Sequence, residues 1–100
     1  MLRSQIAKDF AKSIKSDKIK NIILFGSVAR GDDTEDSDID ILIVSSYKDE
    51  LFDFIYDKIY EILIDNEELI SAHFVDEEKF EKEKDFSFLS TVLKEGVVLA

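Results

Sequence analysis

Three short apolar runs constrain the fold of this chain more than any other feature of its sequence. Residues 22–25 (IILF) and 39–44 (IDILIV) are almost purely apolar, and the first run stops at Gly26. Runs of this length and composition are typical of buried β-strands. Residues 69–75 (LISAHFV) predict a third strand, and residues 97–99 predict a short fourth strand at an edge. The chain is therefore expected to build a small sheet.

Helical periodicity fills much of the chain between these runs. In residues 2–16, four apolar side chains recur every four residues and predict one face of an amphipathic helix: Leu2, Ile6, Phe10 and Ile14. In residues 49–66, with Asp49 expected to cap the helix start, apolar side chains form one stripe. The stripe comprises Leu51, Phe52, Ile55, Ile59, Ile62 and Leu63. Three apolar residues lie off this stripe among acidic neighbours and favour a partner surface: Phe54, Tyr60 and Ile64.

Two further helices complete the order of elements. A short helix is expected to open at residues 76–78, because acidic side chains suit a helix N-terminus. Residues 85–95 predict a last helix, capped by Asp85 and closed by Gly96. Helices and strands therefore alternate, which predicts a single domain, residues 1–100, of the α/β (α+β) class. We expect a small mixed β-sheet flanked by helices.

The composition narrows the classes of function. Acidic residues outnumber basic ones 23 to 13, and the resulting net charge of −10 disfavours direct binding to nucleic acid or to anionic membranes. The chain has no cysteine, which excludes disulfides and cysteine-ligated metal centres. No apolar run approaches the length of a bilayer span, and the N-terminal residues lack the apolar core of a secretion signal. These observations predict a cytoplasmic protein without membrane contact.

Charge is unevenly distributed along the chain. Seven of the 13 Lys and Arg residues, but only two of the 23 Asp and Glu residues, lie in residues 1–30. A basic segment beside an acidic one suits an anionic ligand that is held through cations. A solvated helix face remains the simpler interpretation of any single lysine.

Six of the nine residues from 32 to 40 are acidic, and two of the six stand out. Asp38 leads into the expected strand at residues 39–44, and Asp40 lies within it. Because side chains i and i+2 of a strand point to the same side, the two carboxylates would be neighbours and would repel each other. A bound divalent cation offsets this repulsion, and hard oxygen ligands suit Mg²⁺ or Mn²⁺. The pair therefore predicts a metal site.

A phosphate site is predicted one loop upstream of the acidic pair. The strand at residues 22–25 runs into Gly26 and Ser27. Glycine lets the backbone approach a ligand closely, and a helical turn that begins at Ser27 would aim N–H groups and the hydroxyl outward. Arg30 can add a charge-assisted hydrogen bond to the phosphate. A phosphate site beside a carboxylate pair suits metal-assisted phosphoryl or nucleotidyl transfer.

Two other ligand-binding motifs fail on this segment. A P-loop needs Lys followed by Ser or Thr after Gly31, where this chain has two aspartates. An EF-hand loop that starts at Asp36 needs Gly at its sixth position, which is Ile41 here. Both ligand-binding loops are therefore excluded.

The segment GSVARGDDTEDSDID, residues 26–40, resembles the signature of the DNA polymerase β-like nucleotidyltransferase superfamily. That signature is Gly-Ser followed, after ten residues, by Asp-x-Asp. The Ala-Arg-Gly and Ser-Asp-x-Asp parts are most similar to the minimal nucleotidyltransferases (MNT) of bacteria and archaea. The short length, the order of strands and helices and the Glu-Gly-Val-Val-Leu ending extend the resemblance over most of the chain. The resemblance implies the polymerase β-like nucleotidyltransferase fold.

The same resemblance implies an adenylyltransferase that uses Mg-ATP. In such an enzyme Gly26 and Ser27 would grip the triphosphate, and Asp38 and Asp40 would hold two divalent ions. Minimal members resemble antitoxins that pair with HEPN-domain RNase toxins, and some of them transfer AMP from ATP to a tyrosine of the toxin. The resemblance thus implies a HEPN-domain partner protein that supplies the acceptor. It leaves homo-oligomeric and hetero-oligomeric assembly open.

One position departs from the pattern of the family. A third carboxylate is usual on a later strand, and His73 stands at that place here. A neutral imidazole can bind a metal or accept a proton, but it brings no negative charge to the site. Two functions therefore remain open: an active nucleotidyltransferase with His73 as a metal ligand, and a catalytically weakened nucleotide-binding module that neutralises or scaffolds its partner. A polymerase or tRNA-modifying enzyme would need extra domains and a basic surface, which a separately encoded subunit would have to supply to this chain.

Overall fold

Four strands form one mixed sheet in the computed structural model, which describes residues 2–100. The strands are β1 (Asn21–Phe25), β2 (Ile39–Val44), β3 (Ile70–Val75) and β4 (Val97–Val98). They lie in the order β3-β2-β1-β4. β1 pairs antiparallel with both β2 and β4, whereas β2 and β3 run parallel. The mixed sheet and the short edge strand that the sequence predicts are both confirmed.

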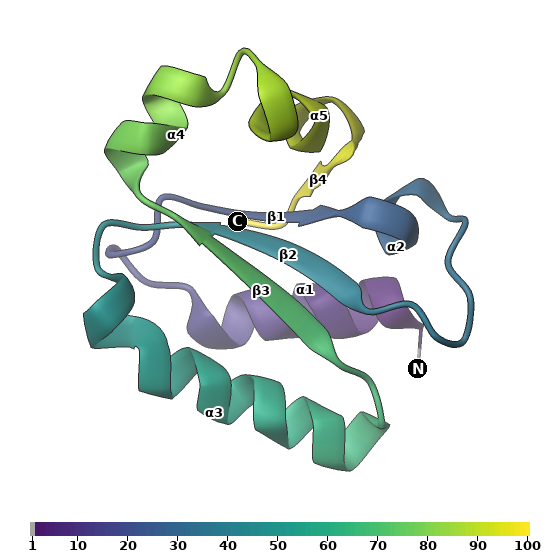
Figure 1. Ribbon diagram of the computed structural model, residues 1–100. Helices are drawn as coiled ribbons and strands as arrows, with labels where there is room; N and C mark the ends of the chain where they lie inside the picture. The colour runs from purple at the N-terminus through teal and green to yellow at the C-terminus, as the bar shows by residue number, and fades with distance from the viewer. Residues whose placement is uncertain (1) are drawn as a thin grey trace.

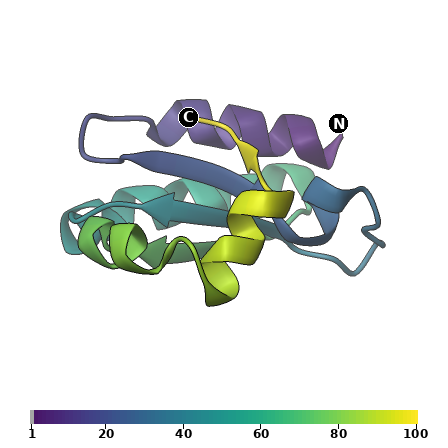
Figure 2. The same cartoon turned by 90° about the horizontal axis from the view of Figure 1, so that it is seen from above.

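Helices cover both faces of this sheet. They are α1 (Arg3–Ile14), α2 (Gly26–Arg30), α3 (Lys48–Asn66), α4 (Glu77–Glu83) and α5 (Ser87–Glu95). The long helices α1 and α3 lie on one face, and α4 and α5 lie on the other (Figures 1 and 2). The short α2 stands at the end of β1 (Figure 1). No helix within residues 2–100 is both long enough and apolar enough to cross a membrane.

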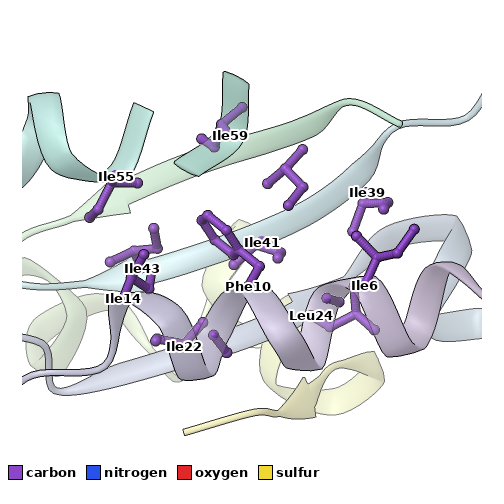
Figure 3. Close-up of a cluster of buried hydrophobic side chains, with 13 residues drawn as sticks. Ile6, Phe10, Ile14, Ile22, Leu24, Ile39, Ile41, Ile43, Ile55 and Ile59 are labelled. Atoms are coloured by element: carbon purple, nitrogen blue, oxygen red, sulfur yellow. The ribbon is translucent and has the colours of Figure 1, made fainter. Parts of the chain in front are cut away.

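The larger core lies between the sheet and the two long helices (Figure 3). Alternation along the strands aims every second side chain at this layer, so that Ile39, Ile41 and Ile43 of β2 all point toward it. From the helices come Ile6, Phe10 and Ile14 of α1 with Ile55 and Ile59 of α3. This aliphatic layer fixes the sheet that carries the polar residues at its end.

The intervening strand residues form a smaller core on the opposite face. Ile23, Phe25, Leu42, Val44 and Val75 pack there against residues of α4 and α5. The helix residues are Phe80, Leu89 and Val92. Because β2 is apolar on both faces, its one polar position, Asp40, is set apart from the rest of the strand.

The helix stripes are narrower than the sequence predicts. Leu2 is 76% exposed because the first helix begins at Arg3 and Leu2 only precedes it. On α3 the expected stripe residues Phe52 and Leu63 are exposed as well, and only Ile55 and Ile59 are fully buried. The physical reason is that α3 packs beside β3, the edge strand, so that part of its apolar face extends past the sheet.

Two of the expected helix caps are wrong. Helix α3 begins at Lys48, one residue before Asp49, and α5 begins at Ser87 rather than at Asp85. The residues at the two N-cap positions are Tyr47 and Phe86, and neither side chain forms a capping hydrogen bond. The predicted start of α4 at acidic residues is confirmed. The Asp76 carboxylate accepts a hydrogen bond of 2.8 Å from the backbone N–H of Glu78.

This difference predicts unequal effects of two alanine substitutions. Asp76→Ala removes a formed cap and should lower the free energy of unfolding by about 1 kcal/mol. Asp85→Ala removes no cap and should change it by less than about 0.5 kcal/mol. Urea unfolding followed by circular dichroism measures both values, and equal losses in the two variants would contradict the cap assignment.

Candidate functional site

The pairing of three strands brings the motif residues to one end of the sheet. Phe25 at the end of β1 is paired with Asp40 at the start of β2, so Gly26 follows directly beside Asp40. In the parallel pair, Asp40 lies opposite Ser71 and the β2 position two residues later lies opposite His73. Alternation along the strands places Asp40, Ser71 and His73 on the face that α4 and α5 cover.

Gly26 is required at its position for two separate reasons. Its φ of 74° lies in the left-handed region, which L side chains rarely adopt. A Cβ atom placed on it would also overlap the Oδ2 atom of Asp40 and lie 3.2 Å from the Asp40 Cγ atom. The strand, the glycine and the helical turn α2 follow one another as the sequence predicts. The glycine of the motif is thus in direct contact with its aspartate.

The two aspartates differ in exposure. Asp38 precedes β2 and is exposed, whereas Asp40 lies in the strand and is half-buried. Within residues 2–100, no Lys or Arg side chain forms an ion pair with either carboxylate. Their oxygen atoms are the donor type that Mg²⁺ and Mn²⁺ prefer, so the residues present fit a hard divalent ion.

His73 points toward Asp40 and not into the core. Its Nε2 atom lies 3.5 Å from the Oδ1 atom of Asp40 and 3.3 Å from the Oγ atom of Ser71. The ring packs edge-on against Phe25, with centroids 5.1 Å apart, and the side chain is 42% exposed. Across the described part of the chain, no three His, Asp or Glu side chains are gathered into a ready metal cluster. The role of His73 as a metal ligand therefore stays a prediction.

Arg30 is engaged by carboxylates of the chain itself. Its Nε atom lies 3.2 Å from an oxygen of Asp32, and its Nη1 atom lies 3.4 Å from an oxygen of Glu95 at the end of α5. The hydrogen bond to Asp32 and the attraction of that charge raise the pKa of the Arg30 guanidinium. A phosphate at α2 would therefore compete with these two carboxylates for Arg30.

Ser27 lies half-buried at the start of α2. Its backbone carbonyl accepts hydrogen bonds from the N–H groups of Gly31, at 2.9 Å, and Asp32, at 3.1 Å. These bonds close the helical turn at Gly31, whose φ of 80° is also left-handed. The turn expected at Ser27 is thus formed, and its geometry is set by two glycines.

Sequence reasoning missed Arg3, which holds the acidic loop in place. Its guanidinium bonds the carboxylates of Asp33 and Glu68 and the carbonyl oxygens of Thr34 and Glu35. The hydrogen bonds to Glu68 and Asp33 raise the pKa of Arg3. The signal was present in the contrast between a basic N-terminal segment and an acidic middle. In the structure, a basic residue of the N-terminal segment forms ion pairs within the chain. The pair of Arg3 with Asp33 connects α1 to the loop before Asp38.

Comparison with known proteins gives a family match over nearly the whole chain. The sequence model of the family described as nucleotidyltransferase domain matches residues 4–99. A Methanocaldococcus jannaschii protein named "Putative protein adenylyltransferase MJ0604" is 45% identical over 102 aligned positions, which cover 99% of each chain.

Two solved structures share the fold. A crystal structure of a "putative nucleotidyltransferase" from Sulfolobus solfataricus has a TM-score of 0.54 at 26% identity and covers 94% of this chain and 76% of its own. A crystal structure of a mutant toxin-antitoxin complex, MntA-HpeT, has a TM-score of 0.59 at 18% identity and covers 100% of this chain and 73% of its own. The expected nucleotidyltransferase fold is confirmed by these similarities.

The contact between Gly26 and Asp40 predicts different effects of alanine at the two left-handed glycines. The Cβ atom of Gly31→Ala would meet no atom within 4 Å. This substitution should lower the free energy of unfolding only through backbone strain, by about 1 kcal/mol. Gly26→Ala should lower the free energy of unfolding by more than this, because the Asp40 carboxylate must also move. In a double-mutant cycle, Asp40→Ala should relieve part of the cost of Gly26→Ala and none of the cost of Gly31→Ala. Urea unfolding of the set measures these couplings, and strictly additive losses would refute the contact.

Proposed function

Because the chain belongs to the nucleotidyltransferase domain family, we propose that it transfers the AMP moiety of Mg-ATP to a hydroxyl group of a partner protein. The observation that carries the proposal is the contact of Gly26 with Asp40. This contact sets the expected phosphate-binding turn directly beside a carboxylate that no Lys or Arg of residues 2–100 neutralises. The name of the Methanocaldococcus jannaschii relative supports a protein as the acceptor.

The phosphates would bind at the turn between β1 and α2. Gly26 leaves room for a phosphate oxygen to approach the backbone, and the Ser27 hydroxyl can donate a hydrogen bond to it. Arg30 would exchange one of its two carboxylate partners for a phosphate oxygen. These residues would fix the triphosphate so that its α-phosphorus lies near Asp40.

Asp38 and Asp40 would hold Mg²⁺, or Mn²⁺ in its place. When bound, the ion polarises phosphate oxygens and lowers the pKa of an attacking hydroxyl. The acceptor oxygen forms a bond to the α-phosphorus of ATP while the bond to the bridging oxygen breaks. Pyrophosphate leaves with the electron pair, and the hydroxyl proton passes to solvent. The products are an adenylylated acceptor and pyrophosphate.

The acceptor is proposed to be a tyrosine of a HEPN-domain toxin, with this chain as the antitoxin. The resemblance to the minimal nucleotidyltransferases supports this assignment, and the MntA-HpeT structure supplies a neighbour of the same fold in a toxin-antitoxin complex. The reaction would then take place in the cytoplasm within a hetero-oligomer. The net charge of −10 disfavours RNA or DNA as a direct ligand.

A second candidate function is a nucleotide-binding module that neutralises its partner without chemistry. His73 favours it, because a neutral imidazole brings no charge to the metal site where a carboxylate would bring one. Phe54, Tyr60 and Ile64 of α3 are all exposed and offer the apolar surface that such a module would use. The two candidate functions predict different effects of an Asp38 substitution. It should abolish AMP transfer by an enzyme, but it should leave toxin neutralisation by a binding module intact.

Transfer of AMP can be tested with a purified HEPN-domain toxin as acceptor. With Mg²⁺, ATP labelled at the α-phosphate should label the toxin, whereas ATP labelled at the γ-phosphate should not. Asp38→Asn should reduce labelling by at least about 100-fold, because a direct ligand of the ion is lost. Asp36→Asn, in the same acidic loop, is the matched control and should keep full labelling.

The same variants separate the two candidate functions. If labelling is absent in the wild type while Asp38→Asn still binds and neutralises the toxin, the protein is a binding module and the transferase proposal is wrong. A toxin whose acceptor tyrosine is replaced by phenylalanine should bind normally and take no label.

A further inference from the structure

A cavity of about 480 Å³ is lined in part by His73, whereas Gly26, Ser27, Arg30, Asp38 and Asp40 do not line it. Its floor is formed by Leu42 of β2 and Val75 of β3, and its rim by the connection between α4 and α5. Both helices lie on the face of the sheet that carries Asp40 (Figure 2). The volume falls within the range of about 300–1,000 Å³ that is common for ligand pockets.

Aromatic contacts connect this cavity to Asp40. The ring of Phe88 lies 5.5 Å from that of Phe25 and 6.3 Å from that of His73. His73 in turn lies 3.5 Å from the carboxylate of Asp40. The imidazole ring of His73 therefore borders both the cavity and the carboxylate of Asp40.

The rim of the cavity exposes two aromatic side chains. Phe86 is 56% exposed and Phe88 is 51% exposed, so both rings present apolar surface to an incoming group. Ser87 between them has a φ of 64°, a left-handed conformation that costs a non-glycine residue roughly 1–3 kcal/mol. Lys79 and Glu83 of α4 add polar groups at the same rim.

The position of the cavity relative to Gly26 indicates which ligand it takes. In the strand order β3-β2-β1, Gly26 follows β1, whereas the sheet residues that line the cavity belong to β2 and β3. In a displacement at phosphorus the attacking and leaving oxygens lie roughly in line. With the pyrophosphate held at Gly26 and Ser27, a hydroxyl that enters through the cavity would approach from the side of β2 and β3.

We propose that this cavity is the acceptor subsite, and that it receives the side chain of a tyrosine beside Phe86 and Phe88. The assignment rests on the proposed AMP transfer, in which a hydroxyl group attacks the phosphorus. It also rests on the aromatic side chains that line the cavity. Two exposed rings match a planar phenol better than the small side chain of serine or threonine. The phenolic oxygen would emerge past His73 toward the α-phosphorus, and its proton would leave to solvent as the bond to phosphorus forms.

Steady-state kinetics test the assignment. Phe86→Ala and Phe88→Ala should each raise the KM for the toxin acceptor about tenfold and leave the Kd for α,β-methylene-ATP within about twofold of the wild type. Leu93→Ala, which removes another exposed apolar side chain from α5, is the matched control and should change neither value. A loss of affinity for the ATP analogue with an unchanged acceptor KM would place the nucleobase in the cavity and overturn the proposal.

A second measurement does not depend on catalysis. N-acetyl-tyrosinamide at millimolar concentration should shift the backbone amide signals of His73, Phe86 and Phe88 in a ¹⁵N-labelled sample, and Phe86→Ala should abolish the shifts. If the wild type transfers no AMP but these shifts occur, the proposed activity fails and the subsite stands. If no shift occurs at these positions, the subsite is wrong whatever the activity.

Discussion

The antiparallel pairing of β1 with β2 is the constraint on which the rest of the site depends. Its register pairs the last residue of β1 with Asp40, so the chain leaves one strand where it enters the other. A slip of one residue would turn Asp40 into the aliphatic core and bring an isoleucine to the site. The apolar residues on both faces of β2 oppose such a slip, because each one that moved would have to leave a packed layer. The packing of the core therefore fixes the place of the polar end of the sheet.

Much of this arrangement could be predicted because it depends on local patterns. The strands fall within one residue of the apolar runs, since a continuous run stopped by Gly26 has few alternatives. Asp40 could be recognised because it is the one charged residue in a buried strand. The turn after β1 could be recognised because glycine is needed where φ is positive.

Other features could not be read from the sequence, because they join segments far apart in the chain. Arg30 meets Glu95 and Arg3 meets Glu68, each across 65 positions, and no local pattern selects these partners among 23 acidic residues. The sequence also left open whether His73 points toward Asp40 or away from it. That direction follows from the parallel register of β2 and β3, which only the folded sheet provides. The missed helix caps have a local cause, because an acidic residue near a helix start can lie in the first turn or before it.

The place of β3 at the edge of the sheet has a consequence for the timing of the proposed reaction. Beyond β3 the sheet has no further strand, so a folded protein could dock against this edge without displacing one. The rate at which one copy could serve successive acceptors would depend on how fast each modified acceptor dissociates, and a long-lived complex would make the protein act once for each partner that it meets.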